Sequence, residues 1–135
     1  MTTQVQARDV IVSFFNPLWL STFPGVKLFY ENTLQVDLDQ VGDSFLTVYI
    51  DFTDSVRQSV DSIPITKSWG EIIFRVFAKE GKGIRATMAM QDYIISVAQY
   101  QKLSGVETEC ARPGRKVSKS GWTSSDLRVP FFYYQ

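Results

Sequence analysis

The chain has 135 residues, of which 44% are hydrophobic, 14% aromatic and 21% charged, and its fourteen basic residues balance fourteen acidic ones. This length predicts one domain over residues 1–135 with an ordinary hydrophobic core, and the zero net charge argues against a basic nucleic-acid binder. Histidine is absent and Cys110 is the only cysteine. These counts exclude histidine-based catalysis, an internal disulfide and most common metal sites.

The sequence gives no sign of a secretory or membrane role. Arg8 and Asp9 interrupt the first apolar stretch, so no signal peptide is expected. No window approaches the ~18 consecutive apolar residues of a membrane span. We therefore expect a soluble protein that is made inside the cell and has no membrane partner.

Hydrophobic periodicity predicts two helices and five strands. A capping box formed by Thr3 and Gln6 begins the first helix, and Pro17 is expected to distort its last turn. Pro130 cannot donate to a strand ladder, which argues for an edge position or a bulge in the last strand. In chain order, we expect a helix over 3–20, strands over 26–36, 45–53 and 69–79, a helix over 84–102, and strands over 106–110 and 122–134, with a loop over 111–121.

The order α-β-β-β-α-β-β is typical of an α+β fold. Parallel neighbours need a connection of a dozen or more residues, whereas antiparallel neighbours need only a tight turn. Because the turns here are short, we expect a mostly antiparallel β-sheet with two packed helices.

Opposite charges are concentrated in different halves of the chain. Residues 1–61 carry three basic and eight acidic side chains, a balance of −5, and residues 62–135 carry eleven basic and six acidic ones, a balance of +5. An acidic segment holds Asp37, Asp39 and Asp43, and a basic segment holds Arg112, Arg115, Lys116 and Lys119. Two interpretations stay open: both segments are solvated loops, or they are complementary faces of a protomer that associates head to tail.

The C-terminal strand ends in four consecutive aromatic residues, Phe131 to Tyr134. Phe131 is expected in the core with Leu127, Val129 and Tyr133, since these alternate along one face of the strand. Phe132 and Tyr134 point to the other face, where aromatic side chains are unfavourable unless a neighbour covers them. We predict that these two residues contact an adjacent subunit or another partner.

Each motif with possible chemistry has a simpler structural interpretation. Cys110 has no histidine to activate it, and residues 79–83 lack the Gly-Lys-Ser/Thr ending of a phosphate-binding loop. Asp51 and Asp54 belong to an exposed strand end rather than to a pocket that would separate their pKa values. The acidic segment lacks the central glycine and terminal glutamate of a calcium loop. We therefore predict no catalytic residue, no cofactor and no metal site.

Taken together, the order of elements and several short motifs resemble the small tail terminator, or tail-completion, proteins of long-tailed phages and prophages. The resemblance extends over about residues 3–134. It rests on the first helix, on Gly121-Trp122 before the final strand, and on segments 26–32, 45–51, 69–77 and 81–83.

The resemblance implies an α+β protein of the virion, located at the head-proximal end of the tail and made in the host cytoplasm. Proteins of this family form a hexameric ring that caps the tail tube, ends its polymerisation and presents a surface to the head-completion or neck proteins. Double-stranded DNA passes through the lumen without sequence-specific binding. The implied partners are thus further copies of the chain, the tail tube protein and a neck protein.

Other functions remain open on the sequence alone. The chain could be a different neck or head-completion connector, or a small ligand-binding or enzymatic α+β domain whose aromatic residues line a pocket. A nucleic-acid-binding module rests only on the basic segment. A closed apolar cavity would favour the ligand-binding domain, and salt-dependent retention of DNA would favour the nucleic-acid binder.

Overall fold

A computed structural model describes residues 2–30, 42, 44–57, 65–79, 81, 84–119 and 121–135. It confirms the α+β class and the mostly antiparallel sheet. The helices are α1 (Gln4–Thr22) and α2 (Ile84–Ala98), and the strands are β1 (Lys27–Tyr30), β2 (Ser44–Arg57), β3 (Thr66–Lys79), β4 (Val106–Thr108), β5 (Arg112–Lys119) and β6 (Trp122–Tyr134).

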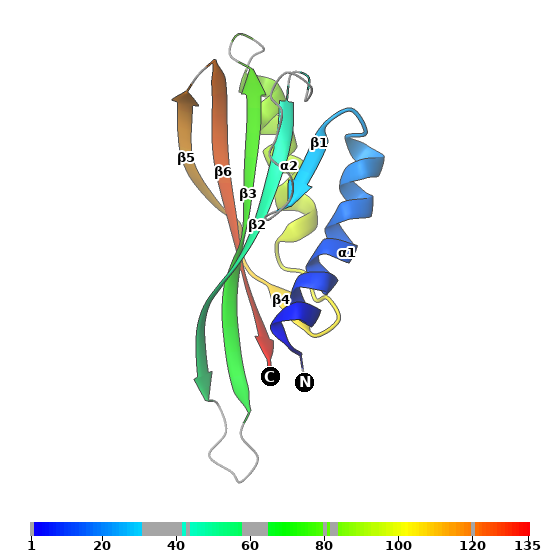
Figure 1. The fold of residues 1–135 in the computed structure, drawn as a ribbon, viewed down its shortest axis with the longest axis vertical. Coiled ribbons are helices and arrows are strands. Elements are labelled where there is room, and N and C mark those ends of the chain that lie inside the picture. The colour runs from blue at the N-terminus through cyan, green and yellow to red at the C-terminus, as the bar shows by residue number, and fades with distance from the viewer. Residues whose placement is uncertain are drawn as a thin grey trace.

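The six strands form one long, twisted sheet in the order β1-β2-β3-β6-β4, with β5 beside β6 on the same side as β4 (Figure 1). Every described pair is antiparallel except β1 with β2. Our argument from short turns missed this pair. Thirteen residues separate Tyr30 from Ser44, which is long enough for a parallel connection.

The first helix begins where the capping box predicts. The Gln6 amide donates to Thr3 Oγ1 at 3.2 Å, and the Thr3 amide donates to Gln6 Oε1 at 3.0 Å. The helix continues past Pro17 to Thr22, so the proline does not break it. Trp19 stabilises this end, because its ring stacks on Phe23 at 4.6 Å between centroids and its Nε1 donates to the Val26 carbonyl at 3.1 Å.

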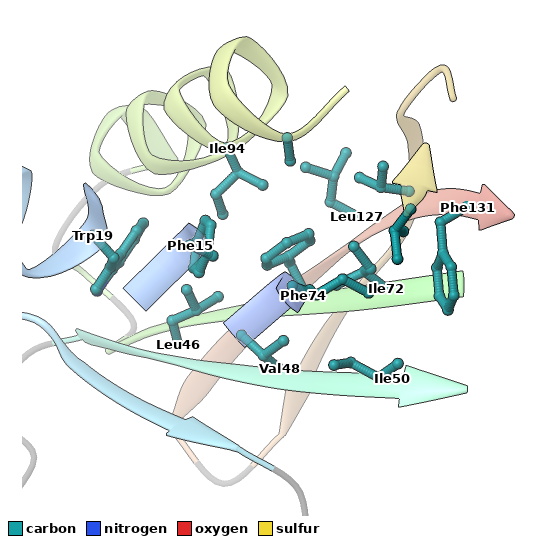
Figure 2. Close-up of a cluster of buried hydrophobic side chains, with 14 of the residues drawn as sticks. Phe15, Trp19, Leu46, Val48, Ile50, Ile72, Phe74, Ile94, Leu127 and Phe131 are labelled. Atoms are coloured by element: carbon teal, nitrogen blue, oxygen red, sulfur yellow. The ribbon is translucent and has the colours of Figure 1, made fainter. Parts of the chain in front are cut away.

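The core lies between the two helices and one face of the sheet. Figure 2 shows Phe15 and Trp19 of α1 and Ile94 of α2 meeting the buried side chains of β2, β3 and β6. Along β3 and β6 buried residues alternate with residues that are mostly half-buried, as expected for a sheet covered on one face, whereas β2 has four consecutive buried residues, 45–48. The buried set includes Leu46, Val48, Ile72, Phe74, Val76, Leu127, Val129, Phe131 and Tyr133.

The segment 111–121 is not a loop, as we had expected, but contains the strand β5. It pairs with β6 through a tight turn at Gly121, whose φ of 79° is in the left-handed region that favours glycine. Every described side chain of β5 is exposed. The strand was missed because, without a buried face, it has no apolar alternation.

Pro130 does not mark an edge strand, because β6 pairs on both sides. Its carbonyl accepts from the Glu109 amide at 2.8 Å, on the side away from β3. The missing N–H of Pro130 points to that same side, since the N–H and C=O of one strand residue share an edge. On that side, β5 pairs with β6 only as far as Arg128, and β4 pairs with β6 only from Phe131 onward. Pro130 lies between these two pairings, where β6 needs no ladder hydrogen bond from its N–H.

Candidate subunit interface

The face of the sheet opposite the helices is not covered by any described helix (Figure 1). We call it the open face, and its side chains are those of β2, β3 and β6 that alternate with the core residues. Groups of aromatic residues lie toward the two ends of the strands, each with a lysine beside its rings. Ion pairs lie between these groups, and the Tyr49 ring lies among them, 5.7 Å from the Arg75 guanidinium.

One end of the open face holds Phe132 and Tyr134, the two aromatic residues predicted to contact a partner. They surround Lys67, together with Trp69 from the neighbouring strand β3. The Lys67 ammonium lies 4.2 Å from the Phe132 ring centroid, 5.1 Å from that of Trp69 and 6.0 Å from that of Tyr134. Tyr134 is 46% exposed. The cluster therefore presents aromatic surface that is held in shape by cation–π contacts.

Sequence reasoning missed Lys67 and Trp69. Trp69 begins the strand predicted over 69–79, and Lys67 lies two residues before that range, in the part of β3 that the structure adds. Only the register of β3 against β6, which sets Lys67 opposite Tyr134 and Trp69 opposite Phe132, brings the four side chains together. A register between strands more than fifty residues apart is not visible in local periodicity.

The centre of the open face is occupied by two ion pairs between β3 and β6. Arg75 binds Asp126 through two hydrogen bonds, at 2.7 Å and 3.3 Å, and Arg128 Nη1 lies 3.0 Å from Glu71 Oε2. Donating these hydrogen bonds to the Asp126 carboxylate raises the pKa of Arg75 above its ordinary value. These four charges neutralise one another within the protomer, which leaves the centre with no net charge for a partner.

The other end of the open face is a second aromatic group. Phe45 stacks on Phe77 with centroids 4.5 Å apart and meets Trp122 edge-on at 5.2 Å, and Lys79 Nζ lies 5.8 Å from the Trp122 ring centroid. Phe45 is buried among these rings even though it faces away from the helices. This end is therefore better covered by its own side chains than the end with Tyr134.

The basic segment lies along one lateral edge of the sheet, in β5. Arg112, Arg115 and Lys116 are exposed, and the backbone of Lys119 ends the strand. A β-bulge lies between Pro113 and Lys116, and such bulges redirect side chains. The structure therefore brings the described members of the basic segment to one edge, as a strand rather than as the loop that we expected.

Two acidic side chains lie toward the opposite side of the sheet, on the part of β2 beyond its described pairing with the edge strand β1. Lys27 and Arg57 are also exposed on that side. Asp37, Asp39 and Asp43, the predicted acidic segment, lie outside the described residues. Asp51 and Asp54 are exposed on β2 beside a bulge between Phe52 and Asp54. The Ser55 amide donates to Asp54 Oδ1 at 2.7 Å, which fixes that carboxylate near the strand.

No described feature resembles a reactive centre. Cys110 follows β4 and is exposed. A hydrogen bond between its side chain and the Tyr100 hydroxyl raises the pKa of Tyr100. Over the described ranges there is no group of three or more acidic or cysteine side chains that could hold a metal ion. The apolar space lined by residues such as Ile11, Phe15 and Phe74 has a volume of only about 10 Å³. Two larger hollows, one lined by residues that include Asp54 and Trp69 and the other by residues that include Tyr49 and Arg75, have volumes of about 300 and 390 Å³.

In the part of the chain that the structure describes, neither helix combines the length and the apolar character needed to cross a membrane.

Comparison by sequence finds no family model and no curated protein that matches the chain. Comparison by structure finds 17 matching chains. One solved protein, whose name is only a sequence identifier, has a TM-score of 0.75 at 10% sequence identity, and the match covers 98% of this chain and 96% of that one. This likeness shows a shared fold over almost the full length of both chains, and no more than the fold.

Proposed function

We propose that this protein is a structural component of a phage virion that forms a ring, most simply a hexamer, on the head-proximal end of the tail tube. The ring ends polymerisation of the tube and presents a joining surface to a head-completion or neck protein. It acts without catalysis, and double-stranded DNA passes through its lumen without sequence-specific binding. The chain is made in the cytoplasm of the bacterial host and functions in the virion.

The observation that carries the proposal is the arrangement of charge across the sheet. Basic side chains of β5 lie along one lateral edge, and Asp51 and Asp54 lie toward the other, on the part of β2 beyond its described pairing with β1. Lys27 and Arg57 are also exposed on that side, so its acidic character is local to the β2 bulge. A basic strand on one side and a local acidic site on the other are complementary to a second copy placed beside it in the same orientation. Such head-to-tail contacts close into a ring where the rotation between copies permits.

The open face supplies the second part of the argument. Lys67, Trp69, Phe132 and Tyr134 form a patch of aromatic rings around one ammonium group. Aromatic residues are enriched in protein interfaces. A contact between this patch and an adjacent subunit or the tail tube explains aromatic side chains on the uncovered side of β6.

The size of the chain agrees with a ring that surrounds DNA. A 135-residue domain has an expected radius of gyration of about 14 Å, which corresponds to a body roughly 36 Å across. Six such bodies in a ring leave a central opening of about the same width. This opening is wider than the diameter of a DNA double helix, so a duplex fits through it with room for side chains that line it.

The proposal is tested by assembling tails from the tail tube protein of the same phage, with and without this chain, and measuring their lengths by electron microscopy. With the chain present, we expect tubes of uniform length that end in a ring. Without it, the tubes should grow past that length. Tubes that overgrow to the same extent in both samples would contradict the capping function.

A further inference from the structure

Two strands carry a bulge toward opposite sides of the sheet: β5, and β2 in the part that extends beyond its described pairing with the edge strand β1. The charged side chains beside the two bulges have opposite signs. On β2, the bulge between Phe52 and Asp54 lies next to the exposed Asp51 and Asp54. On β5, the bulge between Pro113 and Lys116 includes the exposed Arg115 and Lys116. Bulges turn side chains away from the regular alternation of a strand. Both sides of the sheet therefore have a local site where charged side chains can reach sideways.

The strand directions favour pairing between copies that lie side by side. β2, β3, β6 and β5 are successive neighbours, and each pair among them is antiparallel. Strand β5 consequently runs antiparallel to β2 of its own chain. A second copy displaced sideways in the same orientation brings its β5 antiparallel to β2 of the first.

The two bulges are staggered along the strands. Traced through the registers onto β3, the β5 bulge lies level with Phe74 to Val76 and the β2 bulge level with Trp69 to Gly70. This separation of five to six residues amounts to about 18 Å at ~3.3 Å per residue. To bring the β5 bulge of one copy opposite the β2 bulge of the next, the second copy must therefore move along the strand direction as well as sideways.

That shift is compatible with a closed ring. The sideways step spans four strands, or about 19 Å at ~4.8 Å per strand. The two steps combine to about 26 Å between neighbouring copies, less than the ~36 Å width of a sphere of this size, because the copies meet through the edges of their sheets. In a cyclic ring this displacement must be perpendicular to the ring axis, so the strands must tilt by about 43° from that axis. Closed β-barrels hold their strands at roughly 35–45° to the axis.

We propose that Arg115 and Lys116 of one copy bind Asp51 and Asp54 of the next copy, with β5 lying antiparallel beside β2. The inference rests on the proposed ring and specifies which surfaces meet in it. Contact between two β5 edges would set basic side chains against each other, so the charges favour the head-to-tail arrangement over a two-fold one. Self-association therefore depends on the opposite signs of these two bulges.

A charge-swap experiment tests this contact. Arg115→Glu with Lys116→Glu should weaken self-association about tenfold or more, because like charges then face each other across the interface. Asp51→Lys with Asp54→Lys should do the same. Combining all four substitutions should restore the dissociation constant to within about threefold of the original, since opposite charges again face each other. Sedimentation velocity measures the association, and thermal melting confirms that each variant is folded.

The matched control combines Arg115→Glu and Lys116→Glu with Asp9→Lys and Asp92→Lys. Asp9 and Asp92 are exposed on α1 and α2, so this variant has the same total charge as the four-fold swap but leaves the β2 bulge acidic. It should remain dissociated. Equal restoration by the control and by the swap would overturn the inference, because net charge alone would then explain the result.

The remaining outcomes separate this inference from the proposed function. A ring that forms normally in both charge-reversed double variants would overturn the contact and leave the ring intact. A wild-type chain that stays monomeric at every concentration, with or without tail tubes, would overturn the ring and the contact together.

Discussion

Phe131 and Phe132 are adjacent in the sequence but lie in opposite environments. Phe131 is fully buried, with its ring 5.7 Å from Phe52 and 6.3 Å from Tyr133. Its ring also contacts Gly70 so closely that a Cβ at that position would collide with it. Phe132 lies on the open face beside Lys67. One residue thus contributes to folding, and the other is available to a partner.

We expect Phe131→Ala to lower the free energy of unfolding of the monomer by about 3–5 kcal/mol, because it leaves a cavity in a packed core. Phe132→Ala should lower it by less than about 1 kcal/mol, since only a partly exposed cation–π contact is lost. The same Phe132→Ala variant should impair assembly. Urea denaturation of both variants measures the difference, and equal losses would mean that both faces of β6 are buried within one chain.

Tyr30 provides a test at alkaline pH. Its hydroxyl donates to Asn16 Oδ1 at 3.3 Å, and burial raises its pKa to about 12, an effect that the nearby Arg8 partly offsets. The pKa in the folded state is thus above the ordinary value of about 10. The stability that depends on the neutral hydroxyl is therefore fully present below pH ~10 and is lost as the pH rises toward about 12.

We expect the melting temperature of the wild-type chain to fall more between about pH 9 and pH 11.5 than that of Tyr30→Phe, which has no phenol to ionise. Thermal melts of the two proteins in matched buffers measure this difference. Parallel losses in both proteins would show that the Tyr30 hydroxyl does not couple folding to alkaline pH.

At the scale of elements, β5 stands apart from the rest of the sheet. It pairs with β6 alone, and all its described side chains are exposed. β3, by contrast, lies between two long strands and carries core residues along its length. A strand that contributes no side chain to the core has few contacts that oppose its local unfolding in the monomer.

Hydrogen exchange should therefore be much faster for the backbone amides of β5 than for those of β3 in the isolated monomer. In the assembled ring, the β5 amides should become protected, because a neighbouring copy covers that edge. Exchange followed by mass spectrometry, with and without assembly, measures both effects. Protection of β5 that is equal to that of β3 in the monomer, or unchanged on assembly, would contradict the role assigned to this strand.

The elements that were predictable from the sequence are those that bury one face. The capping box and helical spacing located α1, and the alternation of apolar residues located β2, β3 and β6. β5 was missed because it has no buried face, and the parallel pairing of β1 was missed because it depends on a long connection. Strand order and register bring the rings together around Lys67 and place Arg115 and Asp54 on opposite sides of the sheet. Local sequence patterns do not encode this order or register.

At the scale of the whole molecule, the fold divides its surface into regions with different roles. One face of the sheet packs on two helices, and the opposite face has aromatic residues at its ends and neutralised ion pairs at its centre (Figure 1). Strand β5 carries basic side chains along one lateral edge, and the bulge of β2 carries two acidic ones toward the other. Two complementary edges are suited to repeated head-to-tail association, and the open face is suited to a contact with another layer of a larger assembly.

The most direct test of this account is the mass of the assembled particle, measured by sedimentation equilibrium over a wide range of protein concentrations. We predict one closed species of about 92 kDa, six times the 15.4 kDa of a single chain, whose mass stops increasing once it has formed. High salt should dissociate it, because the charges at the two edges are screened over ~8–10 Å at moderate ionic strength. A monomer at every concentration, even with tail tubes added, or a mass that keeps growing with concentration, would contradict the account.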